Sequence, residues 1–310
     1  MLSARKKEPT TLADQPVGDL DVLKQKVDDC PMLPSLRRIG ESLKELLEGE
    51  NATSASIAEI VERDPSLSTR VMKIVNSALF GLSRKVEAIE DAVFYLGVRQ
   101  IRELAMSLPV IDETSSMCAG SASGATWQSF WEHSLAVAVT NREIHGLANL
   151  NEEFDVGYIS GLVHNIGLIA QAQIFPVEFA RNLALPPLDS AQAFTAFERE
   201  NIGWDHGLIG SFYLARHQMG AEILESVQFH VAPSLAVEHP KFAAAVELAE
   251  SIARCSGLIG AEPIELPHQD DWTRSNSLEI LFPEESIRTR AVERLERFAG
   301  KLPLALDVLK

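Results

Sequence analysis

Apolar residues recur three or four positions apart along the first third of the chain, in groups separated by proline and glycine. The groups are Leu36, Ile39, Leu43, Leu46 and Leu47; Ile57, Ile60 and Val61; Leu67, Val71, Ile74 and Val75; and Ile89, Val93 and Leu96. Stripes of this spacing are typical of short amphipathic helices that bury one face. Gly97 separates the last of them from a further helix expected over 98–108.

Turn-forming residues divide the remainder of the chain. The polar stretch 1–18 predicts a disordered lead-in, and a short helix over 19–29 should end at Cys30-Pro31. The Ser-, Gly-, Ala- and Thr-rich stretch 112–126 predicts a loop between two helical lobes, the second of which runs from about 126 to 257. An acidic, proline-containing stretch over 261–285 precedes an amphipathic helix near 284–300. With no alternating strand pattern, the sequence predicts an all-α fold.

Composition narrows the classes of partner. The 310 residues carry a formal net charge of −16, and the one basic cluster, Arg5-Lys6-Lys7, lies at the N-terminus. An acidic surface repels a phosphate backbone, so we expect no direct nucleic-acid binding. Three separated cysteines and no apolar stretch of membrane-spanning length predict a cytoplasmic protein with reduced thiols and no membrane contact.

Four histidines stand out by their spacing. His133, His164, His206 and His230 are separated by 31, 42 and 24 residues, about one helical hairpin each. Antiparallel helices of that length could bring four imidazoles to one point, where they would suit iron, manganese or zinc. Spacing alone leaves a structural role for these histidines open. We expect His145, His217, His239 and His268 to be ordinary core or surface residues.

The residue after His164 is a neutral amide, Asn165, and this weakens the case for a metal enzyme. Metal-assisted phosphoester hydrolysis needs anionic ligands that bridge two cations and hold an activated water. Beyond the imidazoles, Asp205 and Glu250 are the acidic candidates that the sequence offers. The sequence therefore predicts against a tight two-metal centre and, most simply, no cofactor.

Several motifs in order resemble the HDOD domain, the HD-related output domain of bacterial signalling proteins. They are Ile57–Leu67, Val75–Gly81, Ile89–Val93, Leu96-Gly97, Trp131–Ser134, Gly161–Gly167 and Asp205–Gly207. The resemblance covers roughly residues 26–258. It implies a lead-in over 1–25, an HDOD domain over 26–258 with an N-terminal helical lobe (26–111) and an HD-like lobe (126–258), and an acidic C-terminal extension over 259–310.

The resemblance also implies roles for individual residues. HD-type phosphohydrolases use a first histidine, a His-Asp pair and a later aspartate, and one branch adds further histidines. His133 matches the first histidine, His164 the histidine of the pair, and Asn165 replaces its aspartate. His206 and His230 match the added histidines, although Val231 stands where a second adjacent histidine is often found. Glu250 lies roughly where the last aspartate would be.

The family is generally regarded as non-catalytic, so we expect a regulatory module that binds another signalling protein and is not an enzyme. Two alternatives stay open: a divergent metal-dependent phosphohydrolase acting on a nucleotide or cyclic dinucleotide, and a sensor that binds a nucleotide without cleaving it. Asn76–Gly81 is either a partner surface or a helix end, with Phe80 in the core and Gly81 as the stop. Arg99 and Arg102 are either a small basic site or a solvated helix face. The interaction surface and the oligomeric state are left open.

Overall fold

The computed structural model describes residues 19–33, 61–62, 65–76, 85–117, 124–150 and 156–302. Within these ranges every regular element is a helix, apart from one isolated β-bridge between Leu188 and Ile264. The predicted all-α class is therefore confirmed. None of the helices in the described part of the chain combines the length and apolarity needed to cross a bilayer.

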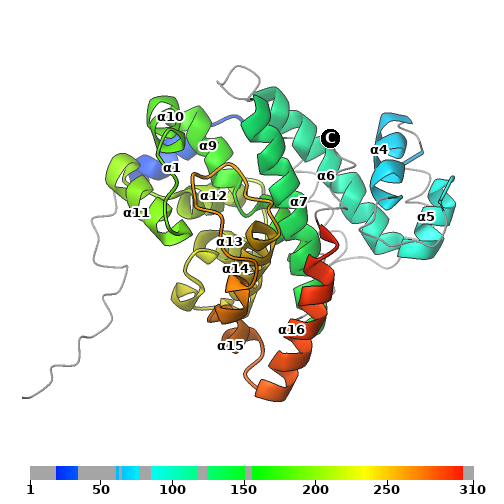
Figure 1. Cartoon of the computed structure of the whole chain (residues 1–310). Coiled ribbons are helices and arrows are strands. Elements are labelled where there is room, and N and C mark those ends of the chain that lie inside the picture. Colours follow the sequence, from blue (N-terminus) through cyan, green and yellow to red (C-terminus); the bar gives the residue numbers. More distant parts are fainter. Residues whose placement is uncertain are drawn as a thin grey trace, which may run out of the picture.

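A small lobe stands apart from the main body in Figure 1, joined to it by a long helix. Its helices are α4 (Pro65–Val75), α5 (Ile89–Leu96) and the beginning of α6 (Val98–Met117). Gly97 turns the chain between α5 and α6 with φ +85°, a conformation that favours glycine. Asn76 links the end of α4 to the next described segment, because its side chain donates to the Val86 carbonyl and accepts from the Val86 amide.

The main body is a bundle around one large apolar core. Its helices are α1 (Leu20–Asp28), α7 (Gly124–Leu147), α8 (Val156–Val163), α9 (Ile166–Ile174), α10 (Pro176–Leu183), α11 (Ala191–Ile202), α12 (His206–Ala215), α13 (Ala221–Phe229) and α14 (Pro240–Cys255). Two short 3₁₀ turns, Pro233–Leu235 and Asp271–Arg274, accompany them. Helices α8 and α14 carry almost continuous runs of buried residues, which marks them as the centre of the bundle.

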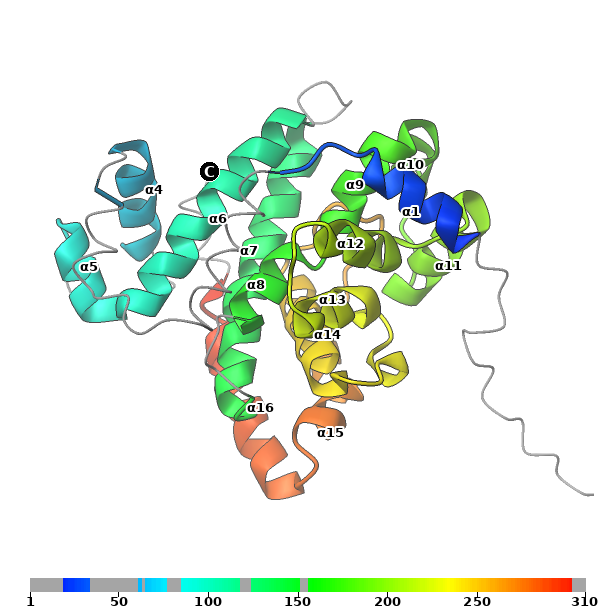
Figure 2. The same cartoon turned by 180° about the vertical axis from the view of Figure 1, so that it is seen from behind.

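The N-terminal helix belongs to this main body. Figure 2 shows α1 beside α9 and α12, far from α4 and α5. His217 contributes to the contact: its Nδ1 donates to the Tyr213 carbonyl (3.0 Å), and its Nε2 accepts from the Leu33 amide (3.1 Å). His217 thus has the structural role that we expected.

The residues after α14 return over the main body. The chain passes Leu188, then forms α15 (Ser277–Leu281) and α16 (Glu285–Ala299), and α16 runs along α7 (Figure 1). Leu278, Leu281, Phe282 and Leu295 are buried in the same core as the central helices. The helix predicted near 284–300 is therefore present, and the extension is part of the packed body.

One prediction needs correction. The stretch 112–126 was expected to be a loop, but α6 continues through Pro109 to Met117 and α7 already begins at Gly124. The middle of the stretch, 118–123, lies outside the described residues. Buried Val110 keeps the later turns of α6 packed on the core, and Thr114 is also buried, with its hydroxyl donating to the Val110 carbonyl (2.7 Å). Tertiary packing has outweighed the weak helix propensity of this run.

Several predictions lie outside the described residues. They concern the lead-in over 1–18, the helical stripe between Leu36 and Leu47, most of the stripe around Ile57–Val61, and Phe80 and Gly81 in the Asn76–Gly81 motif. The Nε of Arg99 lies 3.4 Å from the Oε1 of Glu103 in an ion pair, and the two residues are one helical turn apart on α6. This contact agrees with the interpretation of Arg99 as part of a helix face.

Candidate metal centre

The four spaced histidines lie together in the middle of the bundle, all of them buried. His133 is on α7, His164 is in the turn between α8 and α9, His206 is the first residue of α12, and His230 directly follows α13. Ring centroids are 5.3 Å apart for His133 and His164, 5.3 Å for His164 and His230, and 5.2 Å for His230 and His206. The imidazoles form a continuous row across four elements.

Two glycines allow the helices to approach closely enough for this. A Cβ added at Gly161 on α8 would lie 2.7 Å from the Cα of Ala138 on α7, so only glycine permits that crossing. A Cβ at Gly167 on α9 would lie 1.8 Å from the carbonyl oxygen of His206 on α12. These contacts bring the turn that carries His164 against both α7 and α12.

Hydrogen bonds fix the orientation of three rings. The Nδ1 atoms of His133, His164 and His230 lie 2.6, 2.8 and 2.7 Å from the carbonyl oxygens of Leu258, Gly161 and Val227, respectively. A carbonyl oxygen can only accept, so each Nδ1 carries the proton and each Nε2 keeps its lone pair. Burial lowers the pKa of all three histidines, that of His164 to about 3, which keeps the rings neutral.

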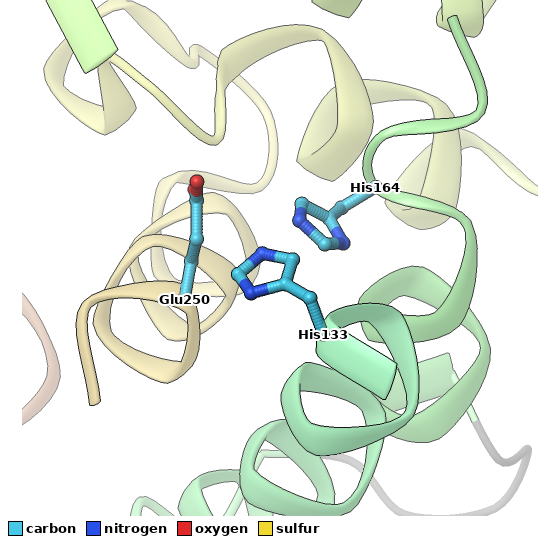
Figure 3. Close-up of side chains that lie close together, drawn as sticks. All are labelled: His133, His164 and Glu250. Atoms are coloured by element: carbon cyan, nitrogen blue, oxygen red, sulfur yellow. The ribbon is translucent and has the colours of Figure 1, made fainter. Parts of the chain in front are cut away.

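Two of these lone pairs are unused. The Nε2 atoms of His133 and His164 are buried and have no hydrogen-bond partner among the described residues. A buried acceptor without a partner is costly, and a divalent cation would satisfy both. One ring nitrogen of each of these two histidines and one carboxylate oxygen of Glu250 lie within 4.8 Å of one another (Figure 3). These residues fit a transition metal, which when bound would act as a Lewis acid.

The other end of the row is held by a carboxylate that the sequence reasoning missed. The Nδ1 of His206 lies 2.6 Å from the Oε2 of Glu198 on α11, and its Nε2 lies 3.3 Å from the Nε2 of His230. Burial alone would lower the pKa of His206, but Glu198 outweighs burial and raises it to about 9. His206 is thus an imidazolium that donates to Glu198 through one nitrogen and to the free Nε2 of His230 through the other.

A second missed carboxylate, Glu262, comes from the segment after α14. Asn165 donates its side-chain amide to the Oε1 of Glu262, and Arg254 lies 3.1 Å from the same oxygen. Arg254 also donates to Glu250 through Nη2 (2.8 Å) and Nε (3.0 Å). Although burial alone would raise both carboxyl pKa values, Arg254 holds that of Glu250 well below its usual range and lowers that of Glu262 to about 2.

These contacts correct the predicted charge of the pocket. We expected little charge beyond Asp205 or Glu250, but the structure buries three carboxylates and a guanidinium beside the histidines. Arg254 had a sequence signal, since it follows Glu250 by four residues on a predicted helix. Glu198 and Glu262 had none, because they come from elements that no motif linked to the histidines.

Asp205, a predicted metal ligand, does not lie among the ring nitrogens. Both of its carboxylate oxygens make structural hydrogen bonds instead. Its Oδ1 accepts from the amide of Leu208 at 2.8 Å and caps the N-terminus of α12. Its Oδ2 accepts from the Nε of Arg199 at 2.8 Å. This cap sets the first turn of α12 and thereby the position of His206.

A cavity of about 370 Å³ opens beside the row of rings. Its lining includes the buried side chains of His230, Glu250 and Arg254, together with residues at the start of α11 and in the 264–271 segment. The acidic residues of the lining are Asp189, Glu247, Glu250, Glu265 and Asp271. Arg254 is the one arginine or lysine among the described lining residues, so the cavity is predominantly acidic.

The sequence comparison decides the family, because a model of the HDOD domain matches residues 33–233, more than half of the chain. The chain belongs to the HDOD domain family. The matched residues include the four histidines, Asn165 and Glu198, whereas Glu250, Arg254 and Glu262 all lie beyond them.

Solved structures share this HDOD fold. A protein of Shewanella amazonensis SB2B described as "Putative phosphohydrolase" is 25% identical, with a TM-score of 0.68 over 93% of this chain and 98% of that one. An HDOD domain protein of unknown function from Geobacter sulfurreducens is 20% identical, with a TM-score of 0.70 over the same shares.

An uncharacterised protein of Treponema pallidum (strain Nichols) is 24% identical over 216 residues, which are 66% of this chain and 38% of that protein. The chain thus spans well under half the length of that relative.

Proposed function

We propose that this chain is a cytoplasmic signal-transduction module that acts by binding another regulatory protein and does not hydrolyse phosphoesters. The observation that carries the proposal is Asn165, which stands beside His164 and donates its amide to Glu262. A neutral amide that is already hydrogen-bonded to a carboxylate cannot bridge two cations. The family membership supports the signalling role.

The charge of the cavity supports the same conclusion. A nucleotide or cyclic dinucleotide is anionic, and paired metal ions normally offset its phosphate charge. Here five acidic side chains line the cavity, and its arginine is bound to Glu250. Neither nucleotide cleavage nor nucleotide sensing is favoured by such a lining.

A hydrolysis assay tests the non-catalytic part of the proposal. The purified full-length chain, supplied in turn with Mn²⁺, Fe²⁺ and Zn²⁺, should release no more product from cyclic dinucleotides, nucleotides or a generic aryl phosphate than its His133→Ala/His164→Ala variant. Metal-dependent turnover by the wild-type chain that disappears in the double variant would contradict the proposal.

Cross-linking in the cells that make the protein tests the interaction part. The wild-type chain and the His133→Ala/His164→Ala variant should yield the same cross-linked protein in similar amounts, because the interaction does not depend on catalysis at the histidines. Absence of a reproducible partner from both chains, with both folded, would count against the interaction.

One observation favours a second candidate, a metal-dependent phosphohydrolase. Four imidazoles converge, and two of their Nε2 atoms are free to bind a cation. The neighbour from Shewanella amazonensis described as a phosphohydrolase shares the fold over nearly the whole chain. The hydrolysis assay separates this candidate from the leading proposal.

A further inference from the structure

A buried guanidinium lies among the acidic groups of the pocket. Arg254 is on the inner face of α14, and its side chain is 7% exposed. Its Nη2 contacts both Glu250 and Glu262, its Nε contacts Glu250, and its Nη1 donates to the Ile259 carbonyl at 2.7 Å. All three of its guanidinium nitrogens are therefore engaged inside the protein.

Electrostatics explains why this cation must be present. Two carboxylates buried side by side repel each other, and neither can stay ionised without a positive partner. In a two-metal site the cations supply that partner. Here both carboxylates face the same guanidinium, and Glu262 also accepts from Asn165.

The guanidinium also affects the histidines. It contacts Glu250, and a carboxylate oxygen of Glu250 lies within 4.8 Å of ring nitrogens of His133 and His164. A metal cation placed between Glu250 and Glu262 would be repelled at short range by the positive charge of Arg254. It would also have to displace the hydrogen bonds that Arg254 makes there. The Nε2 atoms of His133 and His164, in contrast, have no hydrogen-bond partner in the described chain.

We propose that Arg254 is a resident cation in place of a second metal ion, so that the pocket takes a single divalent transition-metal ion on His133, His164 and Glu250. Glu250 joins the two positive centres, since it accepts from Arg254 and also offers an oxygen near the two ring nitrogens. This inference deepens the proposed function. It rests on the proposed function in one respect, which is that the pocket does not carry out the chemistry of a two-metal centre.

Counting metal ions in the full-length chain tests the proposal. The chelator-treated, desalted chain is titrated with Mn²⁺ by calorimetry, and its spin-resonance spectrum is recorded at saturation. The wild-type chain should bind one ion and give the signal of an isolated Mn²⁺. His164→Ala should weaken binding by at least about tenfold, because one of three ligands is lost.

Variants of Arg254 separate its charge from its shape. The double variant Arg254→Gln/Asn165→Asp removes the cation, restores the carboxylate beside His164, and should raise the stoichiometry to two ions with the spectrum of a coupled pair. Arg254→Lys keeps the cation and should bind one ion. The matched control is Arg142→Met, which removes another partly buried arginine that pairs with Glu103 at 2.6 Å outside the pocket and should leave the count at one.

Asn165→Asp keeps the test decisive even where the Arg254 variants do not fold. This change restores the missing carboxylate while leaving the guanidinium in place, so it should still bind one ion. Two ions in the wild-type chain or in Asn165→Asp, none in the wild-type chain, or one in the folded Arg254→Gln/Asn165→Asp variant would overturn the proposal. One bound ion together with hydrolysis would refute the proposed function alone, whereas two bound ions without hydrolysis would refute this inference alone.

Discussion

At the scale of single residues, Asn165 shows how one amide changes the chemistry around it. Its side chain donates to Glu262, which a carboxylate at the same place could not do. In metal-free protein, Asn165→Asp should lower the free energy of unfolding by about 1–3 kcal/mol, because two carboxylates would then face each other. Thermal unfolding with chelator present measures this loss.

The control for that substitution is Asn182→Asp, a change at another buried asparagine, whose Oδ1 accepts from Asn201 away from the histidines. Added Mn²⁺ should recover more stability in Asn165→Asp than in this control. Equal recovery in the two variants would show that residue 165 does not influence the cation.

The contact between His206 and Glu198 predicts a loss of stability in alkali. The folded-state pKa of His206 is about 9, above the ordinary value of 6.5, so its stabilisation is complete below about pH 6.5 and is lost as the pH rises through about 9. This shift corresponds to about 3 kcal/mol. Denaturant unfolding at about pH 7 and about pH 9.5 should show the loss in the wild-type chain and much less of it in Glu198→Gln.

The neutral histidines predict the opposite slope in acid. Burial lowers the pKa of His133, His164 and His230 in the folded chain, so below about pH 6.5 the unfolded chain binds protons that the folded chain does not. Each of these histidines should then lower the free energy of unfolding by about 1.4 kcal/mol for each unit that the pH falls. His145 contributes to the same slope, because burial lowers its pKa to about 4. The slope of unfolding free energy between about pH 6 and about pH 5 should therefore fall by about a quarter in His164→Asn, and an unchanged slope would contradict the assignment.

At the scale of elements, the crossing of α9 and α12 depends on Gly167. Gly167→Ala should destabilise the chain by about 3 kcal/mol or more, because its Cβ would overlap the His206 carbonyl and push apart the elements that carry His164 and His206. Gly300→Ala is the matched control, since its nearest atom would be 3.7 Å away. Thermal unfolding compares the two, and similar midpoints would show that the crossing adapts.

Elements were predictable where local pattern and tertiary packing agree. The apolar stripe at Ile89, Val93 and Leu96 became α5, and the four spaced histidines do converge. The expected loop begins later than predicted, because α6 runs on to Met117 with Val110 buried in the apolar core and Thr114 buried one helical turn after it. Sequence spacing could also not reveal Glu262, since its approach to Asn165 depends on the path of the chain after α14.

At the scale of the whole molecule, the packed core extends well beyond the residues that match the HDOD model. Leu278, Phe282 and Leu295 are buried against the central helices, although the match ends at residue 233. A chain truncated after Leu258 should therefore be aggregated or largely unfolded, with strong binding of a hydrophobic dye. A soluble truncated chain with a cooperative thermal transition would show that the extension is dispensable for folding.

The hydrogen bond between His133 and the Leu258 carbonyl joins a residue within the family match to a part of the chain outside it. Any rearrangement of the 256–262 backbone would free this ring to rotate or change tautomer, and would move Glu262 away from Asn165 at the same time. Grafting residues 33–233 onto a different C-terminal segment would thus transfer the four imidazoles without the Leu258 carbonyl that orients His133, and without Glu250, Arg254 and Glu262. The pocket is therefore complete only when the chain that follows α14 folds back against the helices that precede it.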